Sequence, residues 1–142
     1  MSLTDIPTSL RQRIREAARD RCGYCLSPQR YVMGKLEIEH VVPRARSGSD
    51  DESNLWLSCS LCNRHKGSQT TGVDPLDDAQ VELFSPRTKV WREHFRWSPD
   101  GTFIIGVTPT GRATVEGLRL NNELAVEVRR NWILAGWHPT QN

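Results

Sequence analysis

The stretches CGYC (residues 22–25) and CSLC (residues 59–62) contain all four cysteines of the chain, and Glu39-His40 and Asn54 lie between them. A CxxC turn places both sulfurs on one side of the backbone, and two such turns supply the four thiolates of a tetrahedral zinc site. The alternative is a disulfide or a redox-active pair, which needs an oxidising compartment, whereas residues 1–5 lack the basic start and apolar run of a secretory signal. We therefore expect one structural zinc ion on Cys22, Cys25, Cys59 and Cys62.

Length and composition fit one domain with a core of its own, spanning residues 1–142. Apolar stretches such as residues 132–135 fall far short of the roughly 20 residues that cross a bilayer. We expect a cytoplasmic protein with no membrane partner. The net charge is +2, and its positive excess lies in residues 1–66. Arg outnumbers Lys sixteen to three, a bias that suits bidentate phosphate contacts and is a weak indication of nucleic-acid binding.

Hydrophobic periodicity predicts the elements around the cysteines. Residues 9–21 have apolar side chains at helical spacing, and the basic residues on the outer face of this helix are either solvated or contact backbone phosphates. Residues 36–42 alternate as a strand that Pro43 stops, residues 55–57 form a second strand, and a helix runs to Lys66 before Gly67. The order is therefore strand, long loop, strand, helix.

The second half of the chain predicts different elements. Residues 91–97 and 102–107 alternate around a Pro-Asp-Gly turn at 98–101, which predicts a hairpin. Residues 110–120 and 123–135 predict two helices. We interpret most aromatic residues here, together with His94 and His138, as structural.

Glu39 and His40 are the residues with the clearest chemistry. A carboxylate can bind a hard cation such as Mg²⁺ or Mn²⁺, and an imidazole titrates near neutrality and can activate water. Neighbours on a strand point to opposite faces, so both can serve one site only if the strand bends before Pro43. Asn54 either orients the imidazole or ties the loop down, and Asn63 offers a second oxygen to the cation.

These residues resemble the HNH endonucleases, which have a ββα-metal core. The segment 39–48 is similar to the family's first strand and loop, Asn54 to its middle asparagine, 59–67 to its last helix, and 22–25 to the other half of the zinc clamp. The resemblance implies an α+β fold in which residues 20–68 form the core, clamped by a four-cysteine zinc site. An N-terminal helix precedes this core, and a C-terminal extension (73–142), a hairpin plus two helices packed on the core, follows it.

The resemblance also implies residue roles. His40 is then the general base, Glu39 and Asn63 bind a single catalytic cation (Mg²⁺ or Mn²⁺), and Asn54 positions the base or the loop. Two positions depart from the family pattern: Glu39 stands where Asp is commoner, and position 67 is Gly, so a helical ligand one turn after Asn63 is absent.

The remaining candidates are less specific. His65 lies about 200° around the helix from Asn63; it is a phosphate contact or supporting residue, a metal ligand, or a structural histidine. Candidates for phosphate contact, with solvated surface as the alternative, are Arg44, Arg46, Arg64 and Lys66. The resemblance implies that the activity is hydrolysis of DNA, with double-stranded DNA as the expected partner. A non-catalytic binding module and an RNA-directed nuclease stay open, as does the oligomeric state.

Overall fold

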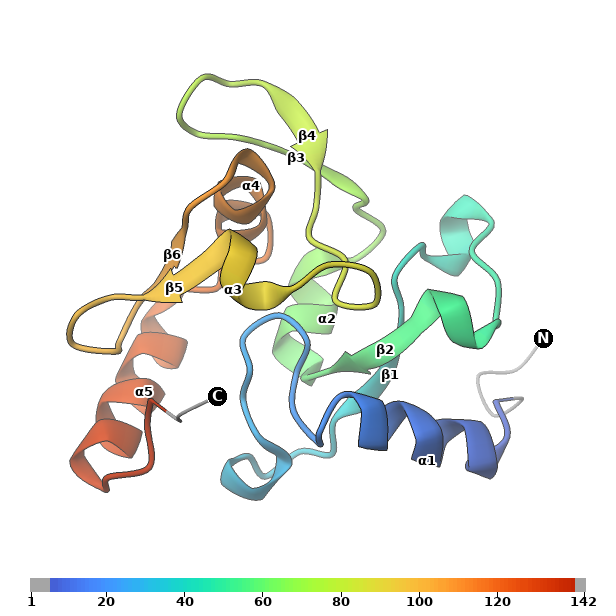
Figure 1. Ribbon diagram of the computed structural model, residues 1–142, viewed down its shortest axis with the longest axis horizontal. Coiled ribbons are helices and arrows are strands. Elements are labelled where there is room, and N and C mark those ends of the chain that lie inside the picture. Colours follow the sequence, from blue (N-terminus) through green and yellow to red (C-terminus); the bar gives the residue numbers. More distant parts are fainter. Residues whose placement is uncertain (1–5, 140–142) are drawn as a thin grey trace. The chain divides into compact units, whose positions relative to one another are not determined.

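A computed structural model describes residues 6–139 of the chain, and Figure 1 shows its helices and strands. Backbone contacts group the chain into two compact units: unit 1 comprises Met1–Thr70 with Ser85–Lys89, and unit 2 comprises Thr71–Phe84 with Val90–Asn142. The expected α+β class is confirmed, because both units combine helices with short antiparallel strand pairs. The assignment to a single domain stays a prediction. Within the described residues, no helix has the length and apolar character needed to cross a membrane.

Unit 1 is built on an antiparallel pair of strands followed by a helix. Strand β1 (Glu37–His40) pairs with β2 (Leu55–Ser58), and α2 (Ser60–Lys66) follows β2 directly. Helix α2 begins at Ser60 because Cys59 caps it, its sulfur accepting the backbone N–H of Cys62 at 3.4 Å. The expected order of strand, loop, strand and helix is therefore present.

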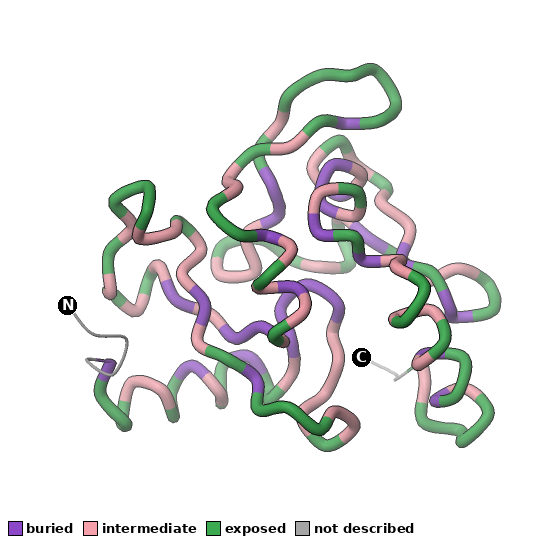
Figure 2. Tube along the Cα trace, turned by 180° about the vertical axis from the view of Figure 1, so that it is seen from behind, coloured by how far each residue is buried: buried purple, intermediate pink, exposed green. Residues whose placement is uncertain are grey.

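Helix α1 (Thr8–Ala17) covers the hairpin of unit 1 and is shorter than the expected 9–21. It ends because Arg19 and Asp20 both adopt positive φ (56° and 54°), which turns the chain toward the first cysteine pair. Figure 2 shows buried, intermediate and exposed residues alternating along this helix. Its inner face joins the hairpin in one hydrophobic core, formed by Ile6, Ile14, Ala18, Leu36, Leu55 and Leu57.

The loop between β1 and β2 contains two 3₁₀ turns, Arg44–Arg46 and Glu52–Asn54. Strand β1 stops at His40, two residues before the expected end, because Asn54 takes over the next backbone groups: its carbonyl accepts Val41 N–H at 2.9 Å and its side-chain oxygen accepts Val42 N–H at 2.8 Å. A Cβ at Gly48 would lie 1.6 Å from the Val42 oxygen, so the loop closes only with glycine there.

Unit 2 contains two hairpins and two helices. Strands β3 (Thr71–Val73) and β4 (Gln80–Glu82) pair with each other, as do β5 (Phe95–Trp97) and β6 (Ile104–Gly106). Helix α4 (Pro109–Gly117) packs on β6 and on the β3/β4 hairpin, and α5 (Glu123–Leu134) follows it. The β3/β4 pair was not expected from the sequence, since its strands are three residues long and mostly exposed.

The expected hairpin over 91–107 is right in its second half and wrong at its start. Residues Trp91–His94 form a helical turn, α3, and only Phe95–Trp97 extend. Buried aromatic packing explains this difference, because Phe95 contacts Trp91 and Phe84 at centroid distances of 5.1 Å each. His94 hydrogen bonds Thr108 through Nδ1 at 2.6 Å, and His138 lies 2.9 Å from the Gly101 oxygen, so both have structural contacts.

Candidate active site and metal centre

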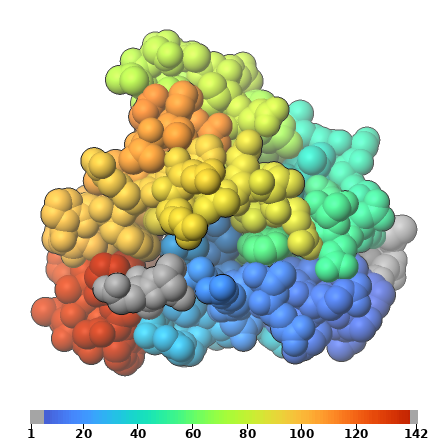
Figure 3. Space-filling view, in the orientation of Figure 1, coloured from blue at the N-terminus to red at the C-terminus, as the bar shows by residue number. Residues whose placement is uncertain are grey.

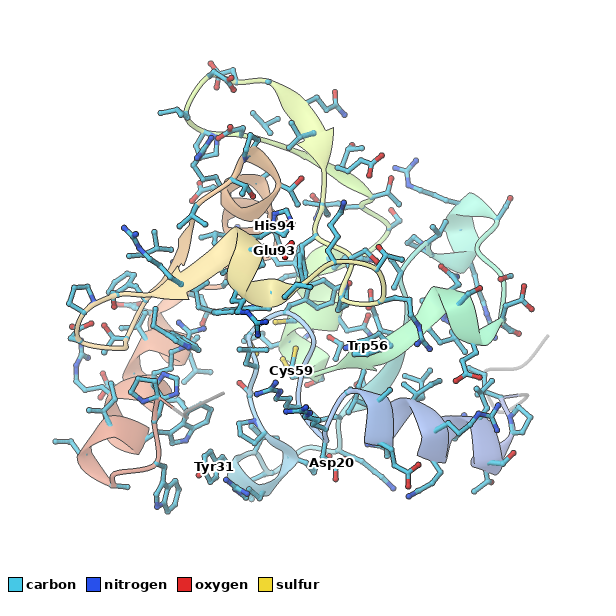
Figure 4. All side chains as sticks on the ribbon, viewed as in Figure 1. Asp20, Tyr31, Trp56, Cys59, Glu93 and His94 are labelled. Carbon is cyan, nitrogen blue, oxygen red and sulfur yellow. The ribbon has the colours of Figure 1, made fainter. Side chains whose placement is uncertain are left out.

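The four cysteine sulfurs meet in unit 1, as the spacing of the two pairs predicts. All four lie within 4.8 Å of one another, and the sulfurs of Cys25 and Cys59 are 3.8 Å apart. A tetrahedral ion with metal–sulfur bonds of about 2.3 Å separates its ligand sulfurs by about 3.8 Å. Figure 4 shows the sulfur atoms gathered beside the label of Cys59. The arrangement fits zinc, and the expected metal-binding cluster is confirmed.

Backbone geometry prepares both turns for thiolates. The N–H of Tyr24 donates to the sulfur of Cys22 at 3.4 Å, which matches the bond from Cys62 N–H to Cys59. Hydrogen bonds among the thiols shift their pKa values in opposite directions. Those from Cys22, Cys59 and Cys62 lower the pKa of Cys25. Hydrogen bonds with Cys22 and the remaining thiols raise the pKa of Cys62. All four can ionise together only if a cation compensates them.

Glu39 lies on the buried face of β1 and is already paired. Its side chain is 1% exposed, its Oε1 lies 2.9 Å from Nζ of Lys66, and the hydroxyl of Tyr24 donates to the carboxylate at 2.8 and 2.9 Å. Burial raises the pKa of Glu39, and Lys66 partly opposes that rise. Since Tyr24 stands between Cys22 and Cys25, the cysteine cluster fixes the position of a group that holds this carboxylate.

Lys66 does not lie on the surface, in contrast to the sequence-based expectation of a phosphate contact. Its side chain is 3% exposed, and its ammonium also donates to the carbonyls of His40 and Val41 at 3.2 and 2.9 Å. The last turn of α2 directs this lysine back at the end of β1. Its three donors are used within the unit, so we remove Lys66 from the group of phosphate contacts.

His40 is held by a residue that the sequence did not single out. Its Nε2 lies 2.7 Å from Oδ1 of Asp50, with 11% of the imidazole side chain exposed. Arg44 donates to the same Asp50 oxygen through Nη2 at 2.8 Å. Hydrogen bonding to His40 and to Arg44 lowers the pKa of Asp50, so this carboxylate is ionised at neutral pH.

Asn54 ties the loop down and does not contact the imidazole in the described contacts. Its Oδ1 accepts Val42 N–H, and its Nδ2 donates to the carbonyls of Val42 and Ser49 at 3.0 and 2.9 Å. Of the two roles considered for this residue, the geometry supports the loop brace. The brace fixes the segment that carries Asp50 toward His40.

Asn63 faces Glu37, which was not a candidate from the sequence. The Nδ2 of Asn63 donates to Oε1 of Glu37 at 2.8 Å. Glu37 lies two residues before Glu39, on the same side of the strand. Because Asn63 uses its side-chain nitrogen for this bond to Glu37, its side-chain oxygen can still act as an acceptor.

Some of these residues line one cavity of about 780 Å³, and all of its lining residues belong to unit 1. His40 and Arg44 contribute to its wall from the end of β1 and the loop, and Asn63 contributes from α2. Among the lining residues, β1 and α2 contribute three with side-chain carboxylate or amide oxygens, the kind of ligand that a hard cation prefers: Glu37, Glu39 and Asn63. The chemistry of these oxygen donors is that of a divalent-cation site, and in this structure Lys66 compensates the carboxylate of Glu39.

The other candidates lie outside this cavity. His65 is half-buried on α2, and its carbonyl accepts from the side chain of Gln69 at 3.0 Å. Arg64 is exposed, and Arg46 donates to the carbonyl of Ser68. Of the four expected phosphate contacts, Arg44 alone is among the cavity-lining residues.

Comparison with known proteins agrees with this geometry. Residues 22–69 match the family model of the HNH endonucleases, so this segment carries an HNH endonuclease domain and the resemblance seen in the sequence is confirmed for it. The chain is also 32% identical, over 76 residues, to the CRISPR-associated endonuclease Cas9 of Corynebacterium diphtheriae. That match covers 50% of this chain and 7% of the relative. No solved structure matches the chain.

Proposed function

We propose that this protein is a metal-dependent endonuclease that hydrolyses phosphodiester bonds in DNA. The observation that carries the proposal is the placement of His40, Glu39 and Asn63 around one cavity, with the imidazole already held by Asp50. A scaffold that only bound nucleic acid would need the cysteine cluster but not this oriented histidine. The matching relative bears the name endonuclease, which agrees with the same chemistry.

His40 acts as the general base in this mechanism. Because the Asp50 carboxylate can only accept, we assign the imidazole proton to Nε2 and the free electron pair to Nδ1. The Nε–H of Arg44 lies 3.3 Å from His40 Nε2 and 3.2 Å from Asp50 Oδ1, and in this tautomer it donates to the carboxylate. Nδ1 takes a proton from water, and the resulting hydroxide attacks phosphorus as the bond to the 3′ oxygen breaks. A water proton then neutralises the leaving oxygen, so the products carry a 5′-phosphate and a 3′-hydroxyl. Asp50 stabilises the imidazolium that forms.

Glu39 and Asn63 would hold the catalytic Mg²⁺ or Mn²⁺, and Glu37 adds a third oxygen-bearing side chain on the same wall. When bound, such a cation stabilises the negative charge that develops on the phosphoryl group and the leaving oxygen. Glu39 can serve this role only by exchanging part of its contact with Lys66. A Glu at this position reaches Lys66 and Tyr24 while still lining the cavity, which accounts for the longer side chain.

Zinc is the ion that we propose for the four cysteines. Zinc binding requires reduced cysteines, so this assignment goes with a reducing compartment such as the cytoplasm. In this role the ion fixes Tyr24 and the start of α2, and through them Glu39 and Asn63, without taking part in the reaction.

A plasmid assay tests the proposal. Purified protein, freed of loosely bound divalent ions, is incubated with supercoiled plasmid with and without Mg²⁺ or Mn²⁺, and His40→Ala is run in parallel. Loss of supercoiled DNA only with added metal, and only with intact His40, supports the nuclease. A protein that binds the plasmid without cutting it in any metal is a binding module, and cleavage confined to an RNA substrate assigns the activity to RNA.

A further inference from the structure

The cavity that His40 lines also has a basic wall, most of which comes from a helix outside the segment matched to the HNH family. Helix α1 and the residue before Leu36 contribute this wall, which we define as Arg11, Arg15 and Lys35. The family match begins at residue 22 and so leaves α1 without an assigned role. Figure 3 shows α1, in blue, exposed along the surface of unit 1.

Helical periodicity gives α1 two separate faces. Ile14 and Ala18 belong to the hydrophobic core, whereas the residues that line the cavity from this helix are Thr8, Arg11, Gln12 and Arg15. Positions 8, 11, 12 and 15 follow the i, i+3, i+4, i+7 spacing of one helical face. The helix therefore binds the core on one side and presents polar and cationic groups to the cavity on another.

Backbone contacts hold the two guanidinium groups in place. Arg11 donates through Nε to the carbonyl of Ile6 at 3.1 Å, and Arg15 donates through Nη2 to the carbonyl of Leu36 at 2.8 Å. A guanidinium carries five N–H donors, and phosphate oxygens accept pairs of them. Lys35 is exposed, lines the same cavity, and precedes Leu36 in the chain, so its ammonium adds a compact positive charge to this wall.

The charge of the whole lining favours an anion. Two acidic residues line the cavity, Glu37 and Glu39, but Lys66 already compensates Glu39. Against them stand the basic wall and Arg44, which itself holds Asp50. Even with Arg44 and Arg11 left out of the comparison, Arg15 and Lys35 outnumber Glu37, the lining carboxylate that Lys66 does not compensate.

We propose that the basic wall binds the phosphates that flank the scissile bond and so places the strand against His40. This inference rests on the proposed nuclease function and deepens it: α1 becomes part of the substrate site. Contacts to phosphate carry no sequence information, so the wall sets position and affinity and does not select bases.

Binding measurements in a catalytically inactive background test the wall separately from cleavage. Fluorescence anisotropy of a labelled DNA duplex is recorded over a range of salt concentrations with His40→Ala protein. Each phosphate contact that is lost should reduce the slope of log K against log salt by about 0.9 for a duplex or about 0.7 for a single strand. We expect that reduction for Arg15→Gln and for Lys35→Gln, and a reduction of about 2 to 3 for the triple variant with Arg11→Gln.

Arg13→Gln is the matched control. Arg13 lies on the same helix and loses the same charge when substituted, but it pairs with Glu52 and is not among the cavity-lining residues. Its salt slope should equal that of the parent protein. Zinc content and thermal melting verify folding for every variant. If Arg15→Gln unfolds because it loses its contact with Leu36, the substitution of the exposed Lys35 still tests whether the wall binds phosphate.

Cleavage assays on variants that retain His40 distinguish a failure of the basic-wall proposal from a failure of the nuclease proposal. Lys35→Gln should raise KM with little change in kcat, because a phosphate contact acts on bound substrate and transition state alike. If the variants still cut DNA with unchanged salt slopes and an unchanged KM, the basic wall does not bind phosphate, and the proposed nuclease function is unaffected. A wild-type protein that never cuts nucleic acid overturns the nuclease itself, whatever the wall variants do in binding.

Discussion

The Nε2 atom of His40 lies 2.7 Å from Oδ1 of Asp50, and Nη2 of Arg44 holds the same carboxylate oxygen at 2.8 Å. Asp50 belongs to the loop that the side chain of Asn54 braces against Val42 and Ser49. A carboxylate in this position fixes both the ring orientation and the tautomer of a histidine. The proposed base is therefore set by contacts within the loop, before any substrate arrives.

Replacing Asp50 by Ala should reduce cleavage by at least about 10- to 100-fold, the loss typical when a hydrogen-bond partner of a metal-bound histidine is removed. Asp50→Glu should recover part of this loss because it restores an acceptor. Two-dimensional NMR of ¹⁵N-labelled imidazole reports the tautomer directly: we expect the proton of His40 on Nε2 in the wild type and a mixture in Asp50→Ala. An unchanged tautomer in Asp50→Ala would contradict the orienting role.

His40→Ala should keep zinc, folding and DNA binding and lose cleavage by about 10²- to 10⁴-fold, the usual contribution of a general base. Added Mg²⁺ or Mn²⁺ should not restore it, whereas imidazole in solution should restore a part. Since Asp50 acts through His40, adding Asp50→Ala to His40→Ala should cost nothing further. Wild-type turnover in a folded His40→Ala protein would remove this residue from the mechanism.

Glu39 has a structural partner, so its substitution has two consequences that must be separated. Glu39→Ala leaves the buried ammonium of Lys66 without its carboxylate and should cost about 3 to 5 kcal/mol of unfolding free energy. The double variant Glu39→Gln with Lys66→Met replaces the buried ion pair and should recover most of that stability. If Glu39 also holds the catalytic cation, the stable double variant should still be inactive. Full activity in it would limit Glu39 to a structural role.

The spacing of the cysteines and the strand pattern allowed the core of unit 1 to be predicted. Two CxxC pairs specify a cluster whose geometry the metal dictates, and the alternation over 36–42 and 55–57 specifies paired strands that hold it. Such features depend on local periodicity and on ligand chemistry, both of which can be read from the order of residue types.

Contacts that depend on how a loop folds could not be predicted. Asp50, Asp51 and Glu52 follow one another, and nothing in their order shows which one reaches His40. Lys66 was expected at the surface, as a phosphate contact or a solvated side chain. Its burial depends on the carboxylate of Glu39, 27 positions earlier in the chain. Helix α3 also departs from the alternating pattern of 91–97, since tertiary packing of Phe95 overrides that pattern.

Replacing Cys62 by Ser should release the metal and unfold unit 1, because a four-thiolate zinc site contributes on the order of 10 kcal/mol to folding. Cys62 also lies in the first turn of α2, which positions Asn63 and Lys66, so activity should be lost together with structure. Elemental analysis should find one zinc per wild-type chain and less in Cys62→Ser, with circular dichroism following the loss of fold. A Cys62→Ser protein that remains folded and zinc-free would show that the metal is dispensable.

In unit 2, Asp74 should make stability depend on acid pH. Arg112 binds its buried carboxylate with two hydrogen bonds of 2.9 Å, and this contact, followed by the backbone N–H of Leu76, lowers the pKa of Asp74. A carboxyl whose folded pKa lies below its unfolded value of about 3.9 stabilises the fold above that value. Its contribution is lost as the pH falls from about 4 through the folded pKa.

Asp74→Asn removes this contribution at neutral pH, so the variant should melt at a lower temperature than the wild type at pH 7, and the difference should narrow below about pH 4. Thermal melts of the full chain, recorded from neutral pH down to about two pH units below the unfolded pKa, provide the measurement. Asp78→Asn, on the exposed turn between β3 and β4, makes the same change of side chain and should leave the melting temperature nearly constant relative to the wild type at every pH. If the difference in melting temperature between Asp74→Asn and the wild type stays constant down to the lowest pH, the Arg112 contact does not depend on the charge of Asp74.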